Sequence, residues 1–257
     1  MLTGSSFQPM SPREYLAASR APRYSITFAL PLLLLYEGLA AVLPATAIAG
    51  VRNGADVLLK TVFVVFGGRT GLAAFGMLVF AAGAWVVWRD RQRHPGPMRA
   101  RVLSTMLVES VVYAAAFGTV TATLTSLLLA GVPLGTAFTQ APAQPMGLGT
   151  QLVVSLGAGI YEELLFRVLL VSGIAGAGIA LGWRRPTALA VAIGLSALIF
   201  SGFHYVGPLG DAFTIRSFAF RAIAGLLLSA LYAARGFGIA AWTHALYDVG
   251  LALAGSG

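Results

Sequence analysis

The chain contains no cysteine, so disulfide bonds, thiolate metal ligands and a cysteine nucleophile are all excluded. Charged residues are also scarce: they make up 10% of the 257 residues, and only nine residues are acidic. Hydrophobic residues make up 58%, and the mean hydropathy is +0.82. This composition lies outside the range of soluble globular proteins and indicates an integral membrane protein.

The net charge of +8 does not indicate a nucleic-acid partner, because the basic residues lie between apolar segments rather than in one cluster. Three arginines precede the first apolar segment, and the short apolar core and cleavage site of a signal peptide are lacking there. We therefore predict a cytoplasmic N-terminal segment at residues 1–24, a first span that is retained, and no nucleic-acid partner.

The chain contains several apolar segments, each close to the length of about 20 residues that a helix needs to cross a bilayer. They predict an all-α fold, a polytopic transmembrane helix bundle of about seven spans, at residues 25–44, 71–88, 103–131, 148–175, 187–205, 213–233 and 237–255. The shorter segment Asp56–Phe66 is predicted to be an interfacial helix. We treat residues 1–257 as a single integral membrane domain.

The segment Arg89–Arg101 contains five arginines and is the strongest cytoplasmic signal in the chain. If it faces the cytoplasm, eleven basic residues lie on that side and four on the other. The eleven are Arg13, Arg20, Arg23, the five of this segment, Arg184, Arg185 and Arg235; the four are Arg52, Lys60, Arg69 and Arg216. This imbalance predicts a cytoplasmic N-terminus, in what we expect to be a bacterial inner membrane.

Two adjacent acids, Glu162 and Glu163, interrupt the apolar segment 156–170. A carboxylate at membrane depth costs roughly 2.5–3.5 kcal/mol on insertion scales, so such residues usually serve a function. Arg167 follows Glu163 by four residues, which places the two side chains on one helical face where they can pair. The acids therefore indicate a chemical site inside the membrane.

Two further polar motifs fall within predicted spans. His204 follows Phe200 by four residues, and His244 precedes Asp248 by four, so each pair shares a helical face. Three helices could thus bring carboxylate and imidazole groups to one point. Such groups can activate water, directly or through a metal ion.

The three motifs in this order resemble those of the CPBP (Abi) family of intramembrane proteases, which includes the type-II CAAX prenyl endopeptidases. Glu162-Glu163-Leu-Leu-Phe-Arg167 matches E-E-x-x-x-R, Phe200-Ser-Gly-Phe-His204 matches F-x-x-x-H, and His244-Ala-Leu-Tyr-Asp248 matches H-x-x-x-N/D. Arg221 also lies where family members often carry an arginine. The resemblance covers about residues 150–255.

The resemblance implies an intramembrane endopeptidase that hydrolyses a peptide bond in a membrane-anchored or lipidated protein or peptide within the lipid bilayer. Glu162 would be the general base that activates water, assisted by His204. Glu163 would pair with Arg167, and His244 would stabilise the oxyanion. The alternatives are a non-catalytic peptide-binding immunity or scaffold protein of the same fold and an ion-coupled transporter.

Asp248 departs from the asparagine that many family members carry, whose amide can donate to an oxyanion. An ionised aspartate only accepts hydrogen bonds. We therefore expect Asp248 to orient His244 and to favour its protonated, donating form, as a carboxylate does in a catalytic triad. Whether it also acts on the oxyanion is left open.

The family is often described as metalloproteases, and four residues could ligate zinc: Glu162, His204, His244 and Asp248. The H-E-x-x-H pattern of zinc proteases is absent from the sequence. A glutamate–histidine pair can also activate water without a metal. The first choice is therefore a mechanism without a cofactor, with Zn²⁺ as the alternative.

Structural interpretations compete with these roles. His204 could be an interfacial or core histidine, and His244 with Asp248 could be an interhelical hydrogen-bonded pair. Arg221 could equally neutralise Asp211 or contact the substrate. Three remaining residues are predicted to play no catalytic part. Glu37 and Glu109 are predicted to be interhelical or water-cavity partners, and His94 is predicted to be a solvated loop residue.

Overall fold

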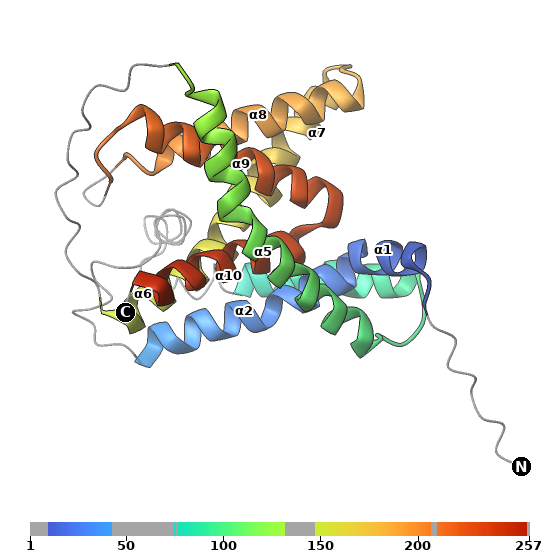
Figure 1. Cartoon of the computed structure of the whole chain (residues 1–257). Coiled ribbons are helices and arrows are strands. Elements are labelled where there is room, and N and C mark those ends of the chain that lie inside the picture. Colours follow the sequence, from blue (N-terminus) through green and yellow to red (C-terminus); the bar gives the residue numbers. More distant parts are fainter. Residues whose placement is uncertain (1–9, 43–74, 76, 132–146, 207–209, 256–257) are drawn as a thin grey trace, which may run out of the picture.

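The computed structural model describes residues 10–42, 75, 77–131, 147–206 and 210–255. Every regular element in this part of the chain is a helix, so the predicted all-α class is confirmed (Figure 1). The segment Asp56–Phe66, predicted to be an interfacial helix, lies outside the described residues.

In chain order, the described helices are α1 (Pro12–Arg20), α2 (Pro22–Val42), α5 (Ala100–Leu128), α6 (Leu148–Gly157), η1 (Ala158–Glu162), η2 (Leu164–Val171), α7 (Ser172–Ala180), α8 (Arg185–Phe203), α9 (Ile215–Arg235) and α10 (Phe237–Gly255). Residues 77–93 are helical as well. Helices α6 to α7 form one continuous helical segment over residues 148–180, against the predicted 148–175.

Within the described residues, four helical segments are long and apolar enough to cross a membrane, which supports an integral membrane protein: Ala100–Leu128, Leu148–Ala180, Arg185–Phe203 and Ile215–Arg235. The predicted count of seven spans is not confirmed. Two of the other three predicted spans, 25–44 and 71–88, extend into residues outside the described part. The third coincides with α10, whose mean hydropathy is lowered by His244 and Asp248.

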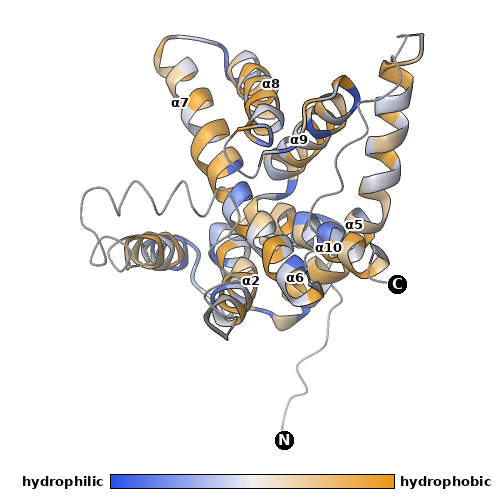
Figure 2. Ribbon diagram, turned by 90° about the vertical axis from the view of Figure 1, so that its left-hand side faces the viewer, coloured by the Kyte–Doolittle hydropathy of each residue, from blue (hydrophilic) through white to orange (hydrophobic). Residues whose placement is uncertain are grey.

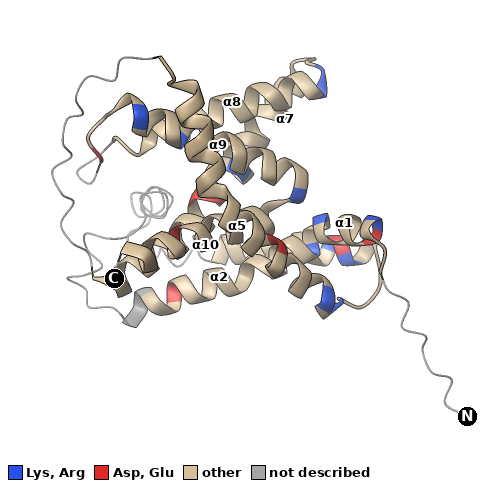
Figure 3. Ribbon diagram, viewed as in Figure 1, with Lys and Arg blue, Asp and Glu red and all other residues tan. Residues whose placement is uncertain are grey.

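The outer surface of the bundle is apolar, and the ionisable groups of the predicted site are inside. Figure 2 shows hydrophobic residues over most of the helical ribbons, and Leu34, Leu127 and Val108 are each about two-thirds exposed. In contrast, Glu163 and Arg167 are fully buried. Charged residues are sparse along the helices and gather near α1 (Figure 3). An apolar exterior with buried charges is the arrangement expected of helices in lipid.

Helix α10 lies at the centre of the bundle, in contact with α2, α5, α6, η1 and α9 (Figure 1). Small residues allow two of these close approaches. A Cβ on Gly159 would lie 2.5 Å from the Ala245 Cβ, and one on Gly238 would lie 2.4 Å from the Ser25 carbonyl oxygen. Small residues at such crossings let helix backbones pack tightly without lipid between them. The crossing at Gly159 brings the acidic segment against the helix of His244.

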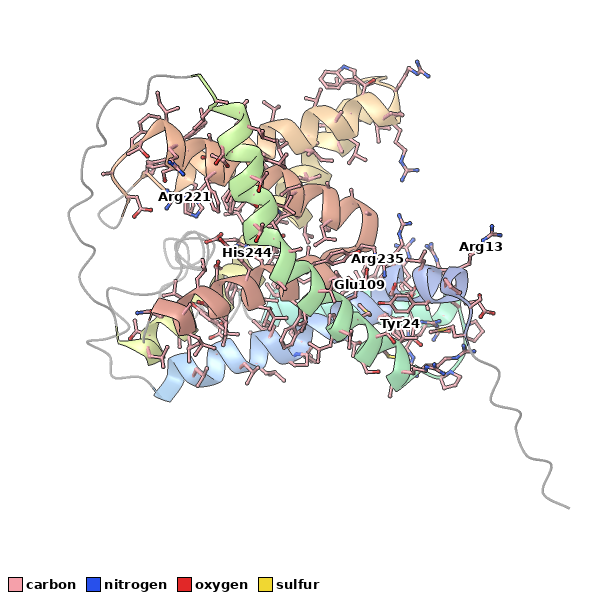
Figure 4. All side chains as sticks on the ribbon, viewed as in Figure 1. Arg13, Tyr24, Glu109, Arg221, Arg235 and His244 are labelled. Atoms are coloured by element: carbon pink, nitrogen blue, oxygen red, sulfur yellow. The ribbon has the colours of Figure 1, made fainter. Side chains whose placement is uncertain are left out.

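A buried ion pair joins α5 to the end of α9 at some distance from the predicted site (Figure 4). Arg235 donates to Glu109 from Nε at 2.6 Å and from Nη2 at 2.7 Å, and Nη2 also donates to Ser19 of α1. Tyr15 of α1 donates to the same carboxylate. From the sequence, Arg235 was counted among the basic residues of the cytoplasmic side; its side chain is buried in this ion pair, and the residue is 6% exposed. Gly236, at φ +86°, reverses the chain immediately after it.

Candidate active site

The acidic segment is not a regular α-helix. Glu162 is the last residue of the π-helix η1, and Glu163 links η1 to the second π-helix η2. The i→i+5 hydrogen bonds of a π-helix change the angular spacing of its side chains, and such turns are often found at functional sites. The sequence pattern, interpreted with α-helical spacing, does not reveal this geometry.

Glu163 contacts two basic side chains through one oxygen atom. Its Oε1 lies 3.0 Å from Nη1 of Arg167, one turn along η2, and 2.8 Å from Nδ1 of His244 on α10. The side chains of Glu163 and Arg167 are fully buried, and that of His244 is 7% exposed. The predicted pairing with Arg167 is thus present, and the contact with His244 is an additional one that local spacing could not indicate.

His244 is placed between three carboxylates. Because Nδ1 donates to Glu163, the ring is oriented with Nε2 on the other side, 3.5 Å from Oδ2 of Asp248 and 3.9 Å from Oε2 of Glu162. The closest carboxylate to the ring is therefore that of Glu163 rather than Asp248, the residue expected to orient it. Glu162, Glu163 and His244 are buried together at the His244 label of Figure 4, and Asp248, with 28% of its side chain exposed, lies at the edge of this cluster.

Phe200 connects the F-x-x-x-H motif to this cluster. The Arg167 guanidinium carbon lies 4.6 Å from the centre of the Phe200 ring, a distance at which a cation–π attraction is effective. The centre of the Phe200 ring is 4.9 Å from that of His204 and 6.2 Å from that of His244. The three motifs therefore meet around one aromatic ring.

His204 caps the end of α8 and is partly exposed. Its Nδ1 donates to the carbonyl oxygen of Phe200 at 2.8 Å. In the neutral ring, this hydrogen bond leaves the lone pair on Nε2, where it can accept a proton. The main-chain bond thus fixes a tautomer that suits the predicted role of assisting a general base.

Arg221 lies on α9, and its closest described partners are Asp211 and Ser217 rather than a carboxylate of the motifs. This is the structural alternative considered from the sequence. Glu37 accepts a hydrogen bond from Tyr161, and Glu109 pairs with Arg235, so both acids have interhelical partners, as expected. The side chain of His94 is 67% exposed and lies 3.2 Å from Asp90.

The residues considered as zinc ligands do not form a recognisable metal site. Among the described residues, no three His, Asp or Glu side chains are grouped so that they could hold a metal ion. Nδ1 of His204 and Nδ1 of His244 each donate to a protein oxygen, which leaves Nε2 as the remaining nitrogen of each ring. We derive no step through a metal.

In a comparison with protein families, residues 144–250 match the type II CAAX prenyl endopeptidase Rce1-like family. Comparisons with curated proteins and with solved structures found no match. The matched region contains all eight residues predicted for the site, and the family supports a membrane protease that acts on a membrane-anchored protein. Residues 144–250 thus match an Rce1-like domain of the type II CAAX prenyl endopeptidases, which is consistent with the CPBP family.

Proposed function

We propose that the protein is an intramembrane endopeptidase in which Glu162, assisted by His204, activates water for attack on a peptide bond. The substrate is a membrane-anchored or lipidated protein or peptide. The observation that carries this proposal is the position of His244, whose ring contacts Glu163 and Asp248 and faces Glu162 within the family-matched region.

The reaction begins with a water molecule that donates a proton to the Glu162 carboxylate as its oxygen attacks the scissile carbonyl carbon. The carbonyl oxygen becomes an oxyanion in a tetrahedral intermediate. When the intermediate collapses, the C–N bond breaks and the amine leaves with the proton held by Glu162. The water has then been divided between a new carboxylate and a new amine, and the side chains return to their initial state.

His244 supplies the charge stabilisation in this scheme. Its Nδ1–H is held by Glu163, so Nε2 has a fixed direction, and a proton on Nε2 can be donated to the oxyanion. Preorganised donors of this kind are effective because they need no rearrangement during the reaction. Asp248, 3.5 Å from Nε2, helps to keep that proton in place before substrate binds.

Glu163 and Arg167 hold the site together rather than acting on substrate. Both are fully buried, and a buried charge is tolerated only when it is paired. The Arg167 charge also lies over Phe200, whose ring is close to both His204 and His244. The ion pair therefore fixes the relative position of all three motifs.

The proposal is tested with the purified protein in lipid nanodiscs and two peptides, one ending in a prenylated CAAX motif and one anchored by an unmodified apolar helix. Cleavage in H₂¹⁸O is followed by mass spectrometry, and we expect one ¹⁸O atom in the new carboxylate of the cleaved peptide. The Glu162→Gln variant should leave both peptides intact, whereas Glu14→Gln, the same change on the exposed helix α1, should cleave at the wild-type rate.

The two peptides distinguish lipidated from non-lipidated substrates, and the comparison of binding with cleavage distinguishes a scaffold from a protease. Cleavage of the prenylated peptide alone indicates a lipidated substrate. Binding of either peptide without cleavage by the wild-type protein would favour the non-catalytic scaffold. Metal analysis of the active sample with a chelator titration tests the zinc alternative separately, and we expect activity to persist in the chelator.

A further inference from the structure

The segment that joins α8 to α9 begins at His204, and a later residue of the same segment, Asp211, forms a hydrogen bond back to His204. The backbone N–H of Asp211 donates to the carbonyl oxygen of His204 at 2.9 Å. Asp211 therefore contacts the main chain of a proposed site residue, although it lies seven positions later in the sequence. A change in the position of Asp211 would be passed directly to the backbone that carries the His204 ring.

Arg221 of α9 holds the side chain of Asp211. Its Nη2 donates to Oδ2 of Asp211, and its Nη1 donates to Ser217 one turn earlier on α9 at 2.8 Å. The guanidinium carbon also lies 5.2 Å from the centre of the Tyr205 ring. Tyr205 directly follows His204, so Arg221 contacts residues on both sides of the connection between α8 and α9 (Figure 4).

Further contacts attach the same connection to α9. The Tyr205 hydroxyl donates to Ser217 at 2.9 Å, and the Tyr205 ring packs against Phe213 and Phe218 with centroid distances of 5.1 and 6.3 Å. Ser201, one turn before Tyr205, donates to the carbonyl oxygen of Phe218 at 2.8 Å. The end of α8 is therefore fastened to the first two turns of α9, with Arg221 at the centre of the polar contacts.

The ion pair is too exposed to contribute much to global stability. The side chains of Arg221 and Asp211 are 23% and 43% exposed, and ion pairs near the surface contribute little on average. Its contacts are nevertheless specific in direction, since Nη1 and Nη2 of the guanidinium donate to two different groups. A geometric role near the site explains this arrangement better than a stabilising one.

We propose that Arg221 is a positioning residue, which together with Asp211 fixes the main chain of His204 and thereby the direction of its ring. This inference rests on the proposed function, in which His204 assists the general base. It differs from a role in substrate binding, because a positioning residue acts through Asp211 and does not contact the substrate itself.

The two roles are separated by a double-mutant cycle with Arg221→Gln and Asp211→Asn, measured as kcat and KM on the peptide that the wild type cleaves. Each single variant should lower kcat by roughly tenfold, because small misplacements near a reacting centre are costly. KM should stay within about twofold of the wild-type value because positioning acts after binding. The double variant should be no slower than either single one, since both changes remove the same contact.

Arg221→Lys should restore part of the lost kcat, and Arg216→Gln, an exposed arginine in the first turn of the same helix, should have no effect. The melting temperatures of all variants should match that of the wild type. Independent losses that multiply in the double variant, or a rise in KM alone on changing Arg221, would overturn the inference and indicate direct substrate contact.

A second measurement does not depend on proteolysis. The chain has three histidines, so the side chains can be assigned by NMR in protein labelled with ¹⁵N-histidine. Arg221→Gln should shift the His204 ring nitrogens and leave those of His94 unchanged. Unchanged His204 signals would refute the positioning role even if peptide cleavage is observed. Failure of the wild type to cleave any peptide, with the His204 shift present, would refute the proposed function and not this inference.

Discussion

Glu163 and His244 are 81 residues apart in the sequence and share a hydrogen bond of 2.8 Å in the centre of the bundle. The same glutamate oxygen pairs with Arg167 at 3.0 Å. One carboxylate therefore neutralises a structural cation and orients a proposed catalytic imidazole. The two adjacent acids have different environments as a result, since the Glu162 oxygen nearest to the ring is 3.9 Å from Nε2.

Replacing Glu163 should damage the fold more than replacing Glu162. Glu163→Gln leaves Arg167 as a buried charge without its partner, which costs about 3–5 kcal/mol. Glu162→Gln removes a charge that the proposed reaction uses but no comparable ion pair. We expect a clearly lower melting temperature for Glu163→Gln than for Glu162→Gln, measured by circular dichroism in detergent.

A paired replacement provides the control. In Glu163→Leu with Arg167→Met, both buried charges are gone, so stability should recover relative to Glu163→Gln while cleavage stays lost. Equal melting temperatures for the two single variants would show that the Arg167 charge does not depend on Glu163.

The close approach of η1 to α10 should not tolerate a side chain at Gly159. A Cβ there would lie 2.5 Å from the Ala245 Cβ and 2.7 Å from the Ala241 carbonyl oxygen, so the helices must separate. Gly159→Ala should cost about 1–3 kcal/mol and reduce cleavage, because Glu162 and Glu163 would move away from His244. Gly173→Ala is the matched control, since no atom lies within 4 Å of the added Cβ. Wild-type stability and cleavage for Gly159→Ala would contradict the described crossing.

The ion pair of Glu109 and Arg235 should anchor α1 to the bundle. Arg235→Gln leaves Glu109 without its cation and removes the bond to Ser19, so α1 should detach more easily. Limited trypsin digestion should then cut at Arg20 or Arg23 faster than in the wild type. Arg216→Gln, which changes an exposed arginine, should leave the rate of cutting at Arg20 and Arg23 unchanged. An unchanged rate at these two sites in Arg235→Gln would show that other contacts hold α1.

The Phe200 ring should help to hold the three motifs in their relative positions. Phe200→Leu keeps an apolar side chain but removes the π face under Arg167, a contribution of about 0.5–2 kcal/mol. Cleavage should fall because His204 and His244 both pack against this ring. Phe203→Leu, which removes another ring that packs on Phe166, is the control for general loss of packing and should reduce cleavage less. Equal losses in the two variants would argue against a special role for Phe200.

Local features of this fold could be predicted from the sequence because they depend on spacing and hydropathy. The predicted span 237–255 coincides with α10, and the pairing of Glu163 with Arg167 follows from residues four apart. The bond between Glu163 and His244 depends instead on how η1 packs on α10, which no local pattern specifies. The count of basic residues placed Arg235 on the cytoplasmic side, but it could not reveal the partner Glu109 on another helix.

The most direct measurement is the cleavage rate of Glu162→Ala and His204→Ala, each purified in lipid nanodiscs and assayed beside the wild type on the same peptide. Their circular dichroism spectra and melting temperatures establish that both variants are folded. We predict that the wild type cleaves the peptide and that neither folded variant does. Cleavage retained in both variants would contradict the assignment of Glu162 and His204 to water activation.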